Sequence, residues 1–414
     1  MTSLKPLLAS LVVPGVSAWK RRRPMAIALL IVGVLAPIVT PVVLVATSGG
    51  ILNLVLDSTA LGVLRVVLIA VVLSRVVALA EVLLATPRRT SIASVGAIVG
   101  VLLVAVPSVW VYGRLGEVSD TIGTVFLSSG SGEPLAVSTS DDSAFTTVML
   151  LAGEEGESRF DVRTDSIVLI TTHRDSGRTA LVSIDGETRN VVFADGTPLD
   201  ARHPDGYGQA ISELYLDVQA DEEMASVYAQ GELAPGAVAL AEALSASLEV
   251  SIDDYVFVHL DGVRTLVDVL GGISVNSGDE FEIPALDGVD AERVGPGLVE
   301  LSGDQAYRLV STRTDASDYQ VMLRQRVVIE SIGRSVSGSI VVRELSNLLT
   351  ALKDSMRSSM SSSEFTDFLD RFTGDGTAVK SIALSPEVID RTSPQWSAAQ
   401  SAIDDLQESL VTLP

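Results

Sequence analysis

The sequence predicts an α/β protein with a mixed central sheet flanked by helices, preceded by a three-helix membrane-spanning region. Two observations predict the membrane region. Residues 1–116 hold ten Lys/Arg against two Asp/Glu, and the uncharged runs 25–47 and 91–112 are 23 and 22 residues long. The rest of the chain, with 19 basic against 50 acidic groups, alternates short β-branched stretches with helical patterns, which predicts the α/β domain.

Residues 25–113 are predicted to form three transmembrane helices after a basic N-terminus at 1–24. Each uncharged run is long enough to cross a hydrocarbon core of about 30 Å, and the first exceeds the apolar segment of about 7–15 residues in a signal peptide. The stretch 50–85 between them is apolar but carries four charges, at Asp57, Arg65, Arg75 and Glu81. Arg75 lies well inside this stretch, where it either faces the helix bundle or contacts a lipid phosphate.

The distribution of basic residues predicts the orientation. Lys20–Arg23 precede the first run, and Arg88 and Arg89 precede the last. Because basic loops stay in the cytoplasm, three spans place both clusters inside and the acidic domain outside. Two spans would leave Arg88 and Arg89 outside, so we expect a multi-pass protein of the plasma membrane with an extracytoplasmic C-terminal domain.

The acidic region begins with a predicted stalk at 114–145, rich in Gly, Ser, Thr and Asp, with one weak strand at 122–127. The α/β domain follows at 146–390, and a C-terminal helix occupies 391–414. Strands are predicted at 147–152, 166–172, 179–184, 189–193, 254–260, 272–276 and 380–384. Helices are predicted at 207–218, 236–247, 262–270, 302–312, 318–335, 341–356, 363–372 and 396–410, with Gly271 and Gly272 closing the third of them.

Composition excludes several classes of function. The chain has no cysteine, so thiol catalysis, disulfides and Cys-ligated zinc are excluded. Its three histidines have no metal-ligand spacing, and the chain has no P-loop, dinucleotide fingerprint or nucleophile elbow. A domain with a net charge of −31 would repel nucleic acid.

Two groups of side chains are candidates for binding. Glu154 and Glu155 end one predicted strand and Arg163–Asp165 begin the next, so their carboxylates are suited to a shared divalent cation; the alternative is solvated loop acids. Arg313, Asp318, Arg324 and Gln325 surround the start of a helix. Arginines there are suited to bidentate phosphate binding; the alternative is surface ion pairing with Asp315 and Asp318.

Several stretches together resemble the LytR-CpsA-Psr family of cell-envelope glycopolymer transferases, over about residues 146–390. The stretch 252–275, Ile-Asp-Asp-Tyr-Val through Leu-Gly-Gly-Ile-Ser-Val, resembles its central motif, and 301–306 matches a second motif. Arg313, Asp318 and Arg324–Gln325 match parts of its arginine-rich motif, and Gly153, Glu155 and Arg163–Asp165 match its first.

The resemblance implies a polyprenyl chain in an apolar tunnel, a pyrophosphate held by arginines and Mg²⁺ (or Mn²⁺), and transfer of the attached glycan to peptidoglycan. It implies Glu155 and Asp165 as metal ligands. It implies Arg163, Arg313, Arg324 and Gln325 as pyrophosphate ligands, and Asp318 and Arg313 as catalytic residues. The expected partners are a polyprenyl-pyrophosphate-linked glycan, peptidoglycan and membrane lipid, with no nucleic acid.

The chain also departs from the family pattern. Gly186, Ser311 and Val321 stand where the family has arginines, and Glu155 replaces an aspartate. Arg189 and Arg308 are nearby in sequence and are candidate replacements. The sequence therefore favours a divergent transferase, with a catalytically silent lipid-binding accessory protein as the alternative. A cytoplasmic regulator would require an even number of spans.

Overall fold

The computed structural model describes residues 9–10, 12–16, 18–19, 22–47, 51–85, 91–126, 135, 144–155, 162–231, 233–312, 318–336, 344, 347–348, 350–353, 355–373 and 380–412. The chain forms two compact units, Met1–Ile122 and Gly123–Pro414.

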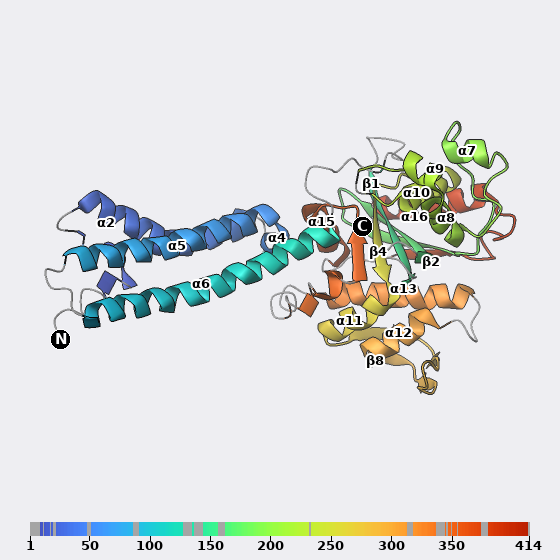
Figure 1. Cartoon of the computed structure of the whole chain (residues 1–414). Coiled ribbons are helices and arrows are strands. Elements are labelled where there is room, and N and C mark those ends of the chain that lie inside the picture. The colour runs from blue at the N-terminus through green and yellow to red at the C-terminus, as the bar shows by residue number, and fades with distance from the viewer. Residues whose placement is uncertain are drawn as a thin grey trace. The chain divides into compact units, whose positions relative to one another are not determined.

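The first unit contains three helices that are long and apolar enough to cross a membrane, Arg23–Thr47, Ser58–Val82 and Ile98–Val125. The first consists of α2 (Arg23–Leu30), a π-helical turn η1 (Ile31–Leu35) and α3 (Ala36–Thr47). The short α4 (Ile51–Leu56) precedes α5 (Ser58–Ala85), and α6 spans Ser91–Val125 (Figure 1). All three predicted spans are therefore helices.

Arg75 of α5 faces the other helices. Its Nη2 donates a hydrogen bond to the carbonyl oxygen of Gly33, 2.9 Å away in the π-helical turn. A Cβ atom on Gly33 would lie 2.7 Å from Oγ of Ser74, so the glycine lets α5 approach the turn closely. This hydrogen bond agrees with the bundle-facing alternative for Arg75.

The second unit has a six-stranded mixed sheet in the order β10-β3-β2-β1-β4-β9. Its strands are β1 (Phe145–Glu155), β2 (Val162–His173), β3 (Thr179–Ile184), β4 (Asp254–His259), β9 (Met356–Ser358) and β10 (Lys380–Leu384). β1 runs antiparallel to β2 and parallel to β4, and β10 runs parallel to β3. β3 is buried along its length, as expected of a strand covered on both faces.

Helices cover both faces of this sheet (Figure 1). One face carries α8 (Ile211–Ala220), α10 (Pro235–Leu248) and α16 (Trp396–Thr412), with the short α7 (Pro198–Arg202) and α9 (Glu222–Val227) beside them. The other carries α11 (Leu260–Leu270), α12 (Gly303–Ser311) and α13 (Asp318–Ser335), and α15 spans Ser362–Thr373. Two small sheets complete the unit: β5 (Ile273–Ser277) with β8 (Gly297–Leu301), and β6 (Phe281–Ile283) with β7 (Glu292–Val294).

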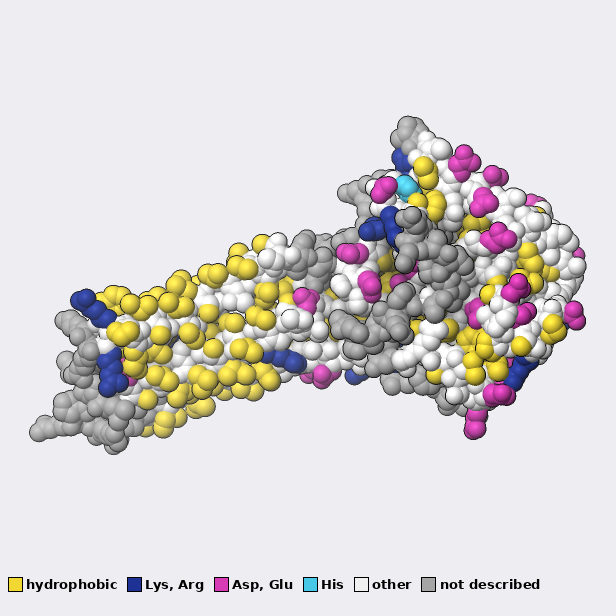
Figure 2. All heavy atoms as spheres, turned by 90° about the horizontal axis from the view of Figure 1, so that it is seen from above, with side chains coloured by type: hydrophobic (Ala, Val, Ile, Leu, Met, Phe, Trp, Pro, Cys, Tyr) yellow, Lys and Arg dark blue, Asp and Glu magenta, His cyan; other side chains and the backbone are white. Residues whose placement is uncertain are grey.

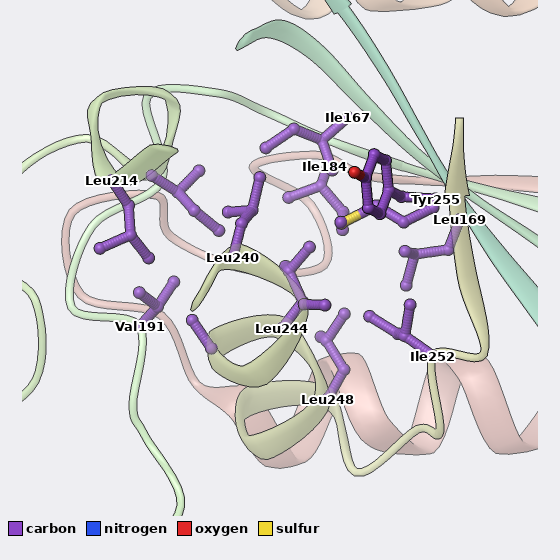
Figure 3. Close-up of a cluster of buried hydrophobic side chains, with 14 of the residues drawn as sticks. Ile167, Leu169, Ile184, Val191, Leu214, Leu240, Leu244, Leu248, Ile252 and Tyr255 are labelled. Atoms are coloured by element: carbon purple, nitrogen blue, oxygen red, sulfur yellow. The ribbon is translucent and has the colours of Figure 1, made fainter. Parts of the chain in front are cut away.

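The main core fills the space between the sheet and α8, α10 and α16 (Figure 3). α10 is buried along almost its whole length, and its alanines allow close packing. A second core lies under α11, α12, β5 and β8. α12 begins with a capping box, in which Ser302 Oγ accepts from the amide of Gln305 and Oε1 of Gln305 accepts from the amide of Ser302. α11 ends at Gly271, whose φ of 84° suits glycine, as predicted.

The predicted elements differ from the structure in several places. The stretch 189–193 is not a strand, because Asn190 has a φ of 54° and only Val191 forms a bridge, to Tyr207. The predicted strand 272–276 pairs with β8 outside the main sheet. α6 remains helical through Val125, so 114–125 is not an irregular stalk and 122–125 is helix where a strand was expected. Most of 127–143, and part of the predicted helix 341–356, lie outside the described residues.

Candidate functional site

The carboxyl end of β1 and the amino end of β2 meet at one edge of the sheet. Gly153 pairs with Thr164, and Glu154 pairs with Arg163. β4 runs beside β1 so that His259 lies opposite Gly153. The backbone thus brings the predicted residues Glu155, Arg163 and Asp165 to a single edge; their side chains lie outside the described structure.

Asp165 occupies a β-bulge in this edge. Ala152 pairs with Ser166 and Gly153 pairs with Thr164, so Asp165 has no partner in the register between β1 and β2. A bulge changes the direction of a side chain, and bulges are frequent next to functional sites. Thr164 beside it is buried, and its Oγ1 donates to the carbonyl oxygen of Ser212, 3.1 Å away. The alternation of polar and apolar residues in the sequence does not predict this bulge.

The loop after β3 reaches the same edge, because Ile184 pairs with Ile167 of β2. The carbonyl oxygen of Gly186 accepts from the amide of Ser212 at 3.0 Å, and that of Thr188 accepts from the amide of Ile211 at 2.8 Å. These bonds use two of the free amides at the start of α8.

Two arginines flank this loop, where the family arginine is replaced by Gly186. Arg189 is exposed, and its amide donates to the carbonyl oxygen of Arg391 at 2.7 Å. Nη1 of Arg391 lies 3.5 Å from Oδ2 of Asp185. Sequence reasoning named Arg189 but missed Arg391, which is about 200 residues away and has no local motif. The fold therefore places two arginines beside the loop, one of which, Arg391, is paired with Asp185.

The predicted residues on α12 and α13 are only partly described. Gln325 is buried, and its Nε2 donates to the carbonyl oxygen of Val310 at 3.0 Å, so this amide fixes α13 against α12. Arg324 beside it is half-buried, with no hydrogen bond or ion pair in the described part of the chain. Arg313 lies outside the described residues, and Asp318 begins α13 with an undescribed side chain.

Arg308 does not replace a missing family arginine, contrary to the sequence-based interpretation. Its side chain is 4% exposed, and Nη1 donates to the carbonyl oxygens of Pro284 and Asp290, each 3.1 Å away. Its Nε lies 3.2 Å from Asp304 Oδ2. Arg308 therefore holds the loop that connects β6 and β7.

The two other departures offer no cation. Val321 is buried in the fold, 3% exposed, and Ser311 Oγ donates to the carbonyl oxygen of Tyr307 at 2.8 Å.

A cavity of about 390 Å³ lies at the opposite end of the sheet, beside the starts of β1 and β4. Asp253, Asp254, Glu364 and Asp367 line it together with Arg371. Burial, with Glu364 and Asp253 adding to it, raises the pKa of Asp254 to about 7, although its Oδ1 accepts a hydrogen bond from Ser359 Oγ at 2.8 Å. No group of three His, Cys, Asp or Glu side chains in the described residues is arranged to hold a metal ion.

Comparison with known proteins gives a consistent set of relatives. The model of the LytR_cpsA_psr family matches residues 127–412. Biofilm regulatory protein A of Streptococcus mutans is 25% identical over 276 residues, which are 65% of this chain and 61% of that protein. The polyisoprenyl-teichoic acid–peptidoglycan teichoic acid transferase TagU of Bacillus mycoides is 23% identical over 278 residues, 65% of this chain and 79% of that protein.

Solved structures with a similar chain path include TagT bound to LI-WTA and TagV of B. subtilis. The first covers 68% of this chain and 98% of that chain, with a TM-score of 0.47 and 17% identity. The second covers 65% and 98%, with a TM-score of 0.46 and 17% identity.

Proposed function

Because the chain belongs to the LytR_cpsA_psr family, we propose that it is a membrane-anchored transferase that moves a glycopolymer from a polyprenyl-pyrophosphate carrier to peptidoglycan. The observation that carries this proposal is the meeting of Glu155, Arg163 and Asp165 at one sheet edge, with Asp165 in a bulge. The transferase name of the TagU relative supports the reaction class. In our proposal the three apolar helices anchor the protein, and its C-terminal unit lies outside the cell.

The donor set at this edge fits a hard divalent cation. Glu155 and Asp165 would supply carboxylate oxygens from neighbouring strands, which Mg²⁺ (or Mn²⁺) prefers, with substrate oxygens completing its coordination. The cation would stabilise negative charge on the departing polyprenyl phosphate.

The remaining roles belong to charged side chains of the chain. Arg163, Arg313 and Arg324 would bind pyrophosphate oxygens by charge-assisted hydrogen bonds. Gln325 fixes α13 against α12 and so positions the neighbouring Arg324. A carboxylate oxygen of Asp318 would accept the proton of the attacking hydroxyl group.

A second candidate function is a catalytically silent protein that binds the lipid carrier. Gly186, Ser311 and Val321 supply no cation, and Arg308 is used within the fold. The exposed Arg189 favours the transferase, because it offers a positive charge to the loop that lost its arginine.

The test uses the full chain in detergent with a polyprenyl-pyrophosphate-linked glycan, Mg²⁺ and peptidoglycan. We expect release of polyprenyl phosphate that stops when Mg²⁺ is chelated, and a loss of about 100-fold or more in Asp165→Asn. Asp175→Asn is the matched control, because Asp175 lies in the exposed turn at the other end of β2.

Each outcome decides one part of the proposal. Mg²⁺-dependent turnover that survives in Asp165→Asn would show that the metal assignment is wrong. Lipid binding without turnover, with the acceptor present, would favour the accessory protein. No binding would leave only the family fold.

A further inference from the structure

Arg65, in the first unit, has no hydrogen bond or ion pair to another residue in the described part of the chain. Arg75 donates to the carbonyl oxygen of Gly33, and Arg114 forms an ion pair of 2.7 Å with Glu117. Arg65 instead lies over the ring of Tyr112, with its guanidinium carbon 5.5 Å from the ring centroid. Its Nε is buried and has no hydrogen-bond partner.

The surroundings hold this guanidinium group in place. A Cβ atom on Gly116 would lie 2.7 Å from Arg65 Nη2, so a side chain there would displace the guanidinium group from its present position against α6. The ring of Tyr112 covers one face of the group by a cation–π contact. Arg65 is thus positioned between α5 and α6 rather than extended into solvent.

Arg65 lies where the apolar surface of the helices ends. It is seven residues after the first residue of α5, about 10 Å along the helix. Trp110 and Tyr112, 64% and 43% exposed, end the run of exposed apolar side chains on α6, as aromatic residues do at a membrane interface. Figure 2 shows the hydrophobic side chains that cover these helices and the Lys and Arg side chains near the ends of that surface.

The acids near the same ends of α5 and α6 have interactions of their own, Asp120 among them. Asp57 Oδ1 accepts hydrogen bonds from the amides of Thr59 and Ala60 at the start of α5. Glu117 is paired with Arg114. An arginine at this depth needs an anionic oxygen, and the component of a membrane that brings one to the interface is a lipid phosphate.

We propose that Arg65, Tyr112 and Gly116 form a binding site for the phosphate of an anionic membrane lipid. The guanidinium group donates to phosphate oxygens, Tyr112 orients it, and Gly116 provides the space. This site is separate from the residues of the proposed transfer reaction and does not depend on that reaction.

The experiment is a lipid titration of the full chain in detergent by native mass spectrometry. The probes are phosphatidylglycerol, a polyprenyl phosphate, phosphatidylcholine and inorganic phosphate. We expect Arg65→Gln to weaken the binding of phosphatidylglycerol about tenfold, as expected for one charge-assisted contact. Arg23→Gln, which removes an exposed arginine at the start of α2, is the matched control and should change affinity less than about twofold.

A second pair of variants keeps the test valid if Arg65→Gln does not fold. Tyr112→Leu should weaken binding about threefold, whereas Tyr112→Phe keeps the ring and should leave binding unchanged. If Arg65→Gln weakens the binding of polyprenyl phosphate but not of phosphatidylglycerol, the phosphate bound at this site is that of the polyprenyl carrier. Equal losses in Arg65→Gln and Arg23→Gln, no loss in either, or displacement of lipid by millimolar inorganic phosphate would overturn the proposal.

Discussion

Replacing Asp254 by asparagine should stabilise the second unit at alkaline pH. Asp254 begins β4 and lines the cavity with Asp253, Glu364, Asp367 and Arg371. Its burial penalises the charged carboxylate, which raises its pKa to about 7 in the folded protein. Asparagine has no charge at any pH and keeps an oxygen that accepts the hydrogen bond from Ser359 Oγ.

The sign and size of the effect follow from proton linkage. An unfolded aspartate has a pKa of about 3.9, so between about pH 4 and 7 the folded protein binds a proton that the unfolded chain has released. The free energy of unfolding therefore falls as pH rises through this window and levels off above pH 7. A shift of about three units corresponds to about 4 kcal/mol, which Asp254→Asn should recover at pH 8.

Trp396 is a suitable probe for this measurement. The chain has three tryptophans, and Trp396 alone lies in the second unit, where its Nε1 donates to the carbonyl oxygen of Asn190 at 3.1 Å. With Trp19 and Trp110 replaced by phenylalanine, urea unfolding of the full chain in detergent can be followed by fluorescence at each pH. The difference between wild type and Asp254→Asn should grow from near zero at pH 4 to its maximum above pH 7.

Asp205→Asn is the control, because Asp205 is an exposed loop residue. It should leave the pH profile of the wild type unchanged. Parallel profiles for wild type and Asp254→Asn, or a variant less stable than wild type at pH 8, would refute the argument that the buried charge destabilises the fold.

Two further substitutions test arginines that donate to backbone carbonyl groups. Arg308→Met should lower the free energy of unfolding of the second unit by about 3–5 kcal/mol, because the carbonyl oxygens of Pro284 and Asp290 lose a buried charged donor. Urea unfolding followed by Trp396 fluorescence measures this loss. Unchanged stability would contradict the role given to Arg308. Arg75→Gln should lower the free energy of unfolding of the first unit by about 1–3 kcal/mol, because the Gly33 carbonyl loses its charged donor. Thermal unfolding in detergent measures this loss, with Arg22→Gln, which changes an exposed arginine, as the control. Equal melting temperatures for the two variants would contradict the prediction.

Elements with a strong local pattern could be predicted from the sequence. The strands 179–184 and 380–384 and the helix 318–335 were predicted with the bounds that the structure has. Short β-branched runs and regular helical periodicity depend on neighbouring residues alone. The stretch 189–193 has a similar composition, but Val191 and Phe193 are buried as part of a loop, since a left-handed Asn190 interrupts the extended backbone.

Features of the candidate site that depend on distant contacts could not be predicted. The bulge at Asp165 exists because of the register between β1 and β2, which no single strand determines. Arg391 lies beside Asp185 because β10 pairs with β3 across the sheet. Arg308 lies close enough in sequence to the matched motifs to suggest a phosphate ligand. Its role depends instead on the carbonyl groups that surround it in the fold.

The contact between Arg75 and Gly33 indicates that the first apolar helix and α5 pack as a defined pair. A π-helical turn alters the regular hydrogen bonding of a helix, and here the carbonyl oxygen of Gly33 within the turn accepts from Arg75. The missing side chain of Gly33 lets Ser74 and Arg75 approach it. An arginine within a membrane is costly unless its partner is in place, so this pair selects one arrangement of the first helix against α5. Anchoring alone would need neither the turn nor the arginine, so their pairing points to a specific packing of these two helices.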